Sequence, residues 1–257
     1  MNEVERPHHW NLIIDSPDNA CNNMRKDMDL FSNIEANEIP ATLRIYSWDQ
    51  PCITYGYSQS LENDFYIEKI PNRTQIAAKR PTGGGIVFHN SGDLTYSIVT
   101  KLETTRLPKG IEQSCTHIHK AIAGMLLELG IIASIAKSTL YNKNKHTFER
   151  ICFATPARYE LVTIQGQKIA GSAQKRGKKA LLQQGTIPFS SDYSFWIPFC
   201  KNTGFITSLK SKSADMESLT TTNFTFDYLA KLLAAHFEKN LGIILTETSE
   251  IDTKTLD

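Results

Sequence analysis

The chain has 257 residues, of which 40% are hydrophobic, and its 28 lysines and arginines nearly balance its 27 aspartates and glutamates. This length and apolar content suffice for one domain with a continuous core. The net charge of +1 excludes the strong positive field with which proteins gather nucleic acid or anionic membranes. Residues 1–10 lack the basic and apolar regions of a signal peptide, and no stretch reaches membrane-spanning length. We therefore expect neither nucleic acid nor a membrane as partner.

Five cysteines stand at positions 21, 52, 115, 152 and 200, without a C-x-x-C pair. An odd number of irregularly spaced cysteines indicates reduced thiols in the cytoplasm rather than a disulfide framework or a zinc site. We expect a cytoplasmic protein with no metal site.

The first half of the chain predicts one helix and four strands. Ser16 as the N-cap and Pro17 as the first helical residue predict a helix that ends before Pro40. Two strands are expected at residues 43–48 and 52–57. Two more are expected between residues 86 and 99, joined as a hairpin by the turn at residues 90–93.

The second half predicts two amphipathic helices around three strands. Residues 112–129 and 227–241 carry apolar helical faces, and Gly130 and Gly242 are placed to end these helices in a left-handed conformation. The strands are expected at residues 159–164, 168–173 and 180–187. They are antiparallel because their connections are short.

We therefore expect an α+β fold with a mainly antiparallel or mixed sheet flanked by helices. Residues 1–247 would form a single domain, followed by a polar tail at 248–257. The polar, lysine-rich residues 138–150 predict a loop of the kind that covers sites.

Three consecutive glycines, Gly83 to Gly85, stand between Arg80 and an apolar strand that ends at His89. Because glycine has no Cβ atom, such a run marks a tight turn or a surface where a ligand lies against peptide N–H groups. Beside an arginine, such amides suit a carboxylate, a thioester oxygen or a phosphate. A tight strand entry is the alternative.

Lys168 is followed by small residues, including Gly171, Ser172 and Ala173, so a ligand could approach this strand closely. The pattern by itself is also typical of a solvated lysine after a turn. His89 has no partner in the sequence that would identify it as a base. His117 and His119 are two residues apart and so point to different sides of a helix, which makes them poor joint metal ligands.

Cys152 follows the polar segment and precedes the three strands. A cysteine accepts an acyl group as a thiolate, and a cation such as Arg150 or Lys168 would lower the pKa of its thiol. The alternative, a small buried hydrophobe, is the interpretation we give to the other four cysteines. The basic residues at 175–179 form either a solvated turn or a docking site for an acidic carrier protein.

Two segments together resemble the lipoate and biotin protein ligase superfamily: Arg80-Pro81-Thr82-Gly83-Gly84-Gly85-x-Val87-x-His89 and Gly166-x-Lys168-Ile169-x-Gly171-Ser172-Ala173-Gln174. The resemblance covers about residues 10–189. It implies the catalytic-domain fold of that superfamily and an apolar tunnel for an octanoyl or lipoyl chain. Lys168 would contact the acyl group, and the substrate-binding residues would be Arg80, Thr82, Gly83, Gly84, Gly85, His89, Gly171, Ser172 and Ala173.

The segment Cys152-Phe153-x-x-Pro156-x-x-Tyr159-Glu160-Leu161 resembles the one that carries the acyl-accepting cysteine in a group of octanoyltransferases. This resemblance implies that Cys152 and Lys168 are catalytic and that no cofactor is needed. The donor would be octanoyl-acyl carrier protein and the acceptor a lysine of a lipoyl domain.

Two alternatives stay open. The triple glycine is closer to an ATP-dependent lipoate-protein ligase, which would use ATP and magnesium to make lipoyl-AMP. Gln184 and Lys79 stand where family members often have histidine and arginine, which favours an acyl-binding relative without turnover.

Overall fold

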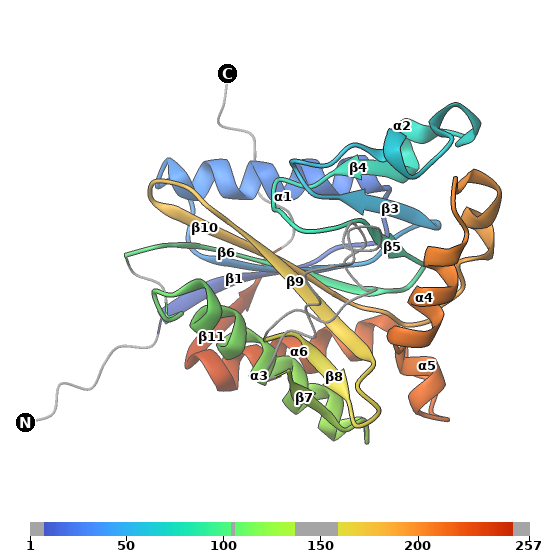
Figure 1. Ribbon diagram of the computed structural model, residues 1–257. Coiled ribbons are helices and arrows are strands. Elements are labelled where there is room, and N and C mark those ends of the chain that lie inside the picture. Colours follow the sequence, from blue (N-terminus) through green and yellow to red (C-terminus); the bar gives the residue numbers. More distant parts are fainter. Residues whose placement is uncertain (1–7, 104–105, 137–158, 249–257) are drawn as a thin grey trace, which may run out of the picture.

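The computed structural model describes residues 8–103, 106–136 and 159–248. Its larger sheet has eight strands in the order β11-β1-β2-β6-β10-β9-β8-β7 (Figure 1). Their bounds are β1 His8–Ile14, β2 Thr42–Tyr46, β6 Leu94–Lys101, β7 Ala133–Ile135, β8 Leu161–Thr163, β9 Lys168–Arg176, β10 Ala180–Ile187 and β11 Ile243–Glu247. Strand β1 pairs in parallel with β11 and β2, and the other neighbours are antiparallel. The sheet is therefore mixed, which confirms the predicted fold class.

A smaller sheet in the order β4-β3-β5 lies beside α1 (Figure 1). Its strands are β3 Cys52–Tyr55, β4 Ala77–Lys79 and β5 Val87–His89. The helices are α1 Ala20–Glu35, α2 Arg73–Ile76, α3 Ile111–Glu128, α4 Gly204–Lys212, α5 Met216–Leu219 and α6 Phe226–Leu241, with short 3-10 turns at Leu61–Asn63, Ile67–Lys69 and Ser194–Phe199. No helix within the described ranges is long and apolar enough to cross a bilayer.

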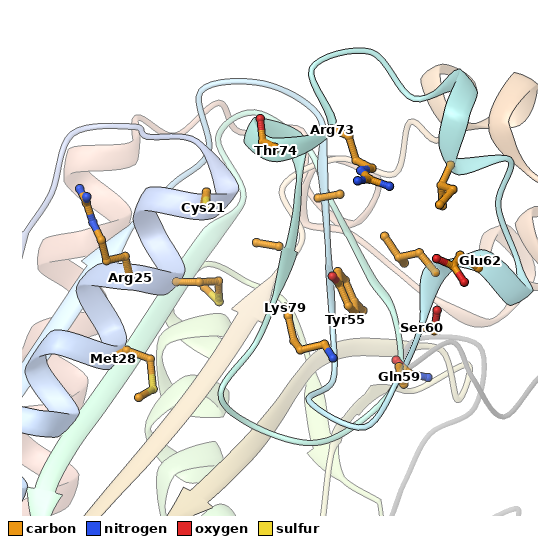
Figure 2. A pocket seen from close by; sticks show the side chains of 15 residues that line it. Cys21, Arg25, Met28, Tyr55, Gln59, Ser60, Glu62, Arg73, Thr74 and Lys79 are labelled. Carbon is orange, nitrogen blue, oxygen red and sulfur yellow. The ribbon is translucent and has the colours of Figure 1, made fainter.

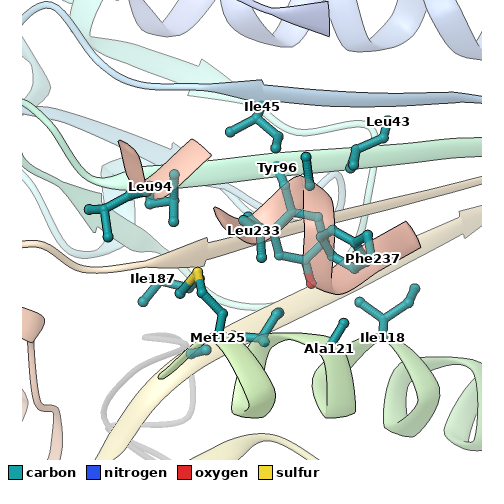
Figure 3. Close-up of a cluster of buried hydrophobic side chains, with 14 of the residues drawn as sticks. Leu43, Ile45, Leu94, Tyr96, Ile118, Ala121, Met125, Ile187, Leu233 and Phe237 are labelled. Carbon is teal, nitrogen blue, oxygen red and sulfur yellow. The ribbon is translucent and has the colours of Figure 1, made fainter. Parts of the chain in front are cut away.

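Helices α3 and α6 cover one face of the larger sheet, and α1 covers the other (Figure 1). The main core lies between the sheet and α3 and α6, where Tyr96 of β6 packs 5.4 Å from the Phe237 ring, centroid to centroid (Figure 3). A second, aromatic core under the smaller sheet contains Phe65, Phe88 and Trp196. Because both cores are close-packed, they hold the two sheets in fixed positions. The space between the sheets can therefore stay open as a cavity.

The first helix begins later than the sequence predicted. Its N-cap is Asn19, whose side chain accepts from the Asn22 amide at 2.9 Å, and not Ser16. The preceding residues continue alongside β2 instead, because the Asp15 amide donates to the Ile45 carbonyl at 2.9 Å. Pairing with an adjacent strand therefore overrides the local Ser-Pro signal.

The predicted hairpin between residues 86 and 99 is wrong. The turn exists, with Gly92 at φ 85°, but β5 pairs with β3 while β6 pairs with β2 and β10. The Asp93 carboxylate accepts from the amides of Asn90 at 3.0 Å and Phe189 at 2.8 Å. These bonds hold the chain where it leaves one sheet and enters the other.

Several other predictions are confirmed. Gly130 and Gly242 follow α3 and α6 with φ of 79° and 62°, and strands β8, β9 and β10 form the expected antiparallel meander. Residues 138–150 and the tail from 249 onward lie outside the described residues. The sequence analysis missed four strands, β1, β4, β7 and β11.

Candidate active site

A narrow cavity of about 40 Å³ lies between the two sheets and the start of α1. Met24, Tyr46, Trp48 and Val87 give it apolar walls. Its floor comes from two adjacent strands of the larger sheet, the small residues 171–173 of β9 and residues 184–186 of β10. Small residues on much of the floor and large apolar side chains on the walls leave a narrow, apolar slot between the two sheets.

Arg80 holds the glycine loop in place from within. Its guanidinium donates to the carbonyls of Gly83 at 3.0 Å and Gly85 at 2.6 Å, and to Thr54 Oγ1 at 2.9 Å. The side chain is buried. These bonds satisfy two buried carbonyls of the loop and fix its conformation.

The loop also depends on a glycine outside the triple run. Gly84 adopts φ 91°. A Cβ atom on Gly56 would lie 2.2 Å from the Gly84 carbonyl oxygen. Gly56 therefore has to be glycine for the loop to approach the end of β3, which explains its place in the sequence.

Lys168 is fully buried, and its ammonium lies 2.5 Å from Glu160 Oε1. The side chain lies over Gly171, where a Cβ atom would be 2.6 Å from Lys168 Cε and 2.7 Å from Nζ. Gly171 itself lines the cavity. Because residue 171 has no side chain, the buried Lys168 ammonium and its partner Glu160 can lie beside the cavity floor.

The turn before β8 places Glu160, a residue whose role the sequence analysis did not identify. Tyr159 adopts φ 73°, an uncommon conformation for a residue other than glycine. Hydrogen bonds surround it: its amide donates to Ala136 O at 3.1 Å, its hydroxyl donates to Glu112 Oε2 at 2.6 Å, and its carbonyl is bonded to His119 Nδ1. His119, which the sequence analysis judged a poor metal ligand jointly with His117, also lies 3.1 Å from Ser172 Oγ.

A chain of buried polar groups connects the glycine loop to α1. Thr82 Oγ1 donates to Gln184 Oε1 at 2.8 Å, and Gln184 Nε2 donates to Asp27 Oδ2 at 2.5 Å. Asp27 also accepts from Arg44 at 2.7 Å, Tyr46 at 3.0 Å and Ser97 at 2.8 Å. All six side chains are buried. Thr82 therefore stands behind the cavity and supports it through Gln184, which lines the cavity.

His89 lines the cavity as a neutral imidazole. It stacks on Trp48 with ring centroids 4.1 Å apart, and burial followed by the charge of Arg80 holds its pKa well below the usual range. Thr54 Oγ1 accepts from Arg80 and can donate to His89 Nε2 at 2.8 Å, which puts the ring proton on Nδ1. Within the described part of the chain, Nδ1 has no hydrogen-bond partner.

The structure thus gathers most of the predicted residues at one place. Five of them, Arg80, His89, Gly171, Ser172 and Ala173, line the cavity, and Lys168 adjoins it. Thr82 does not line the cavity but donates a hydrogen bond to Gln184, which does. In the same way, the carbonyls of Gly83 and Gly85 accept hydrogen bonds from Arg80, which lines the cavity. Cys152 lies outside the described residues, so its catalytic role stays a prediction.

The other four cysteines were expected to be buried, and this is wrong for Cys21, which is exposed, and for Cys115, which is half-buried. Burial raises the pKa of Cys52 well above its usual range, that of Cys115 to about 11 and that of Cys200 to about 12. These three thiols are protonated at neutral pH and are poor nucleophiles. Among the described residues, no cluster of three or more His, Cys, Asp or Glu is arranged to hold a metal ion.

Comparison with known proteins identifies the family of the chain. Residues 19–238 match the lipoyl protein ligase A/B catalytic domain. The chain is 31% identical over 245 residues to an octanoyltransferase LipM of Bacillus cereus, covering 92% of this chain and 87% of the relative, and 29% identical over 261 residues to that of Halalkalibacterium halodurans, covering 96% and 94%.

Among solved structures, a putative lipoate protein ligase from T. acidophilum with bound lipoic acid superposes with a TM-score of 0.72 at 19% identity, covering 96% of this chain and 90% of the other. At 19% sequence identity, this structural similarity shows a shared fold. Since the family model spans most of the chain and a relative is 31% identical over 92% of it, this protein belongs to the lipoyl protein ligase A/B catalytic domain family.

Proposed function

We propose that this protein is an octanoyltransferase that moves an octanoyl group from acyl carrier protein, through a thioester on Cys152, to a lysine of a lipoyl domain. The observation that carries the proposal is the Lys168 ammonium, held by Glu160 over Gly171 beside an apolar slot. The relatives named octanoyltransferase, which cover nine-tenths of the chain, support the same activity.

The proposed reaction has two acyl transfers. The Cys152 thiol gives up its proton and attacks the thioester carbonyl as a thiolate, the carbon–sulfur bond to the carrier breaks, and the carrier sulfur takes up a proton in exchange and leaves as a thiol. The amine of the acceptor lysine then attacks the octanoyl-cysteine, forms the amide and releases Cys152. In both steps negative charge develops on the carbonyl oxygen, where the Lys168 ammonium and the loop amides would stabilise it.

Intact-mass measurement tests this proposal. Incubation with octanoyl-acyl carrier protein is expected to add one octanoyl group to the wild-type chain, and addition of a lipoyl domain is expected to remove it. Cys152→Ser should form no thioester and transfer no octanoyl group. Full transfer by Cys152→Ser would overturn the covalent route.

A lipoate-protein ligase is the second candidate, favoured by the three glycines at 83–85. In that reaction Lys168, Arg80 and the loop would bind an acyl adenylate, and Cys152 would have no role. Lipoate-dependent exchange of pyrophosphate into ATP separates the candidates, because only the ligase makes an adenylate. Absence of transfer from either donor would instead leave an acyl-binding relative without turnover.

A further inference from the structure

A second, wider pocket of about 670 Å³ opens next to the acyl cavity, between α1 and β4. We call it the α1–β4 pocket. One wall is the first half of α1, with Cys21, Arg25 and Met28, and the other is formed by Tyr55 of β3, Arg73 of α2 and Lys79 of β4 (Figure 2). Its volume lies within the range of sites for small organic ligands, and the residues assigned to the acyl cavity do not account for it.

The side chains of this pocket carry an excess of positive charge. Arg25, Arg73 and Lys79 line it against a single carboxylate, Glu62. None of these three cations forms an ion pair with a carboxylate in the described ranges; Lys79 lies 5.7 Å from the centroid of the Tyr55 ring. Cations that are not neutralised by the protein itself favour an anionic ligand.

The α1–β4 pocket adjoins the acyl cavity along one stretch of backbone. Lys79 lines the pocket and the next residue, Arg80, lines the cavity and holds the glycine loop. Met24 lines both spaces. Met24 and the consecutive residues Lys79 and Arg80 thus place the cationic pocket directly beside the acyl cavity.

We infer that the α1–β4 pocket binds the phosphopantetheine arm of the acyl donor, with its phosphate near Arg73 and Lys79. The inference rests on the proposed octanoyl transfer. This arm combines a phosphate, which suits the cations, with an amide-containing chain, which suits the hydroxyl and amide side chains of Gln59, Ser60 and Thr74 in the same pocket. Met24 and Met28 can adapt to its alkyl segments. The arm ends in the thioester that must reach the cavity.

Two small donors test the inference: octanoyl-phosphopantetheine and octanoyl-pantetheine, which differ only in the phosphate. For the wild type, kcat/KM is expected to favour the phosphorylated donor. Arg73→Gln or Lys79→Gln should reduce that preference about fivefold, and the double variant should reduce it further, because each removes one charge facing the phosphate. Lys120→Gln, an exposed lysine on α3, is the matched control and should leave the preference unchanged.

The outcomes distinguish this inference from the proposed function. Transfer from both donors with a preference that Arg73→Gln and Lys79→Gln do not alter would overturn the pocket assignment and leave octanoyl transfer intact. No transfer from any octanoyl donor, together with pyrophosphate exchange, would overturn both. If the variants raise the KM for ATP in that exchange, the pocket serves a nucleotide phosphate and the pantetheine assignment is wrong.

Discussion

The buried Lys168–Glu160 ion pair adjoins the cavity, and its contributions to stability and to catalysis can be separated. Lys168→Met leaves the buried Glu160 carboxylate without its ammonium partner and should lower the free energy of unfolding by about 3–5 kcal/mol. Adding Glu160→Gln should restore much of that stability while transfer stays lost. Urea unfolding and initial rates of octanoyl transfer provide the two readouts. Recovery of transfer in the double variant would show that Lys168 is structural.

Gly171 allows the Lys168 side chain to lie over the strand. Gly171→Ala puts a Cβ atom 2.6 Å from Lys168 Cε, and the buried ammonium has to move. We expect a loss of about 1–3 kcal/mol in stability and a larger proportional loss in kcat. In Gly83→Ala, whose Cβ atom would lie 3.8 Å from its nearest neighbour, stability should change by less. Equal losses of stability in both variants would contradict the crowding at position 171.

Asp93 should make stability depend on pH. Burial raises its pKa to about 7, above the value of about 4 for an unfolded aspartate. The folded state therefore binds the proton more tightly, and stability falls as pH rises from about 4 to about 7. Between pH 5 and pH 7, the free energy of unfolding of the wild type should fall by about 2 kcal/mol more than that of Asp93→Asn. Denaturant titrations at each pH measure this difference, and parallel profiles would contradict it. The exposed Asp29→Asn is the control.

At the scale of elements, the sequence predicted what local patterns determine. The apolar faces and terminal glycines of α3 and α6 are local signals, and so are the short turns between β8, β9 and β10. Strands β1 and β11 were missed because β1 begins with His8 and His9 and pairs in parallel with the opposite end of the chain. Such pairing leaves no mark in a short window of sequence.

The same limit applies to the site. The glycine loop and Lys168 were predictable because small residues surround both. The position of Glu160 was not predictable. It depends on the left-handed conformation of Tyr159 and on the hydrogen bond of Tyr159 to His119, which is 40 residues away along the chain. The polar chain behind Thr82 was also missed, because Gln184 is 102 residues from Thr82.

One contact between elements fixes the turn between β9 and β10. Glu35, at the end of α1, accepts from the amides of Lys178 at 2.7 Å and Lys179 at 3.0 Å, and also from that of Ala180. Glu35→Ala should speed hydrogen exchange at these amides about tenfold, because opening the turn no longer breaks these bonds. The exposed neighbour Glu38→Ala is the control. Unchanged exchange in Glu35→Ala would show that the strands alone fix the turn.

For the whole molecule, the cavity exists because α1 and the two sheets share one buried polar network. Asp27 belongs to α1, Gln184 to the larger sheet, and Thr82 to the loop that leaves the smaller sheet. Apolar packing alone would let these three parts slide against one another, whereas buried hydrogen bonds have definite directions and partners. The network therefore sets where the glycine loop stands above β9 and β10.

Gln184→Leu tests this coupling. It leaves the buried Thr82 hydroxyl without its acceptor and Asp27 without one donor, so the free energy of unfolding should fall by about 1–3 kcal/mol. Thr82→Val removes the orphaned hydroxyl, so the double variant should be more stable than the sum of the single losses predicts, by about 1 kcal/mol. Pairing Gln184→Leu with Thr225→Val, at the N-cap of α6, should be additive. Additivity in both pairs would mean that the loop is held by Arg80 alone and that α1 does not position it.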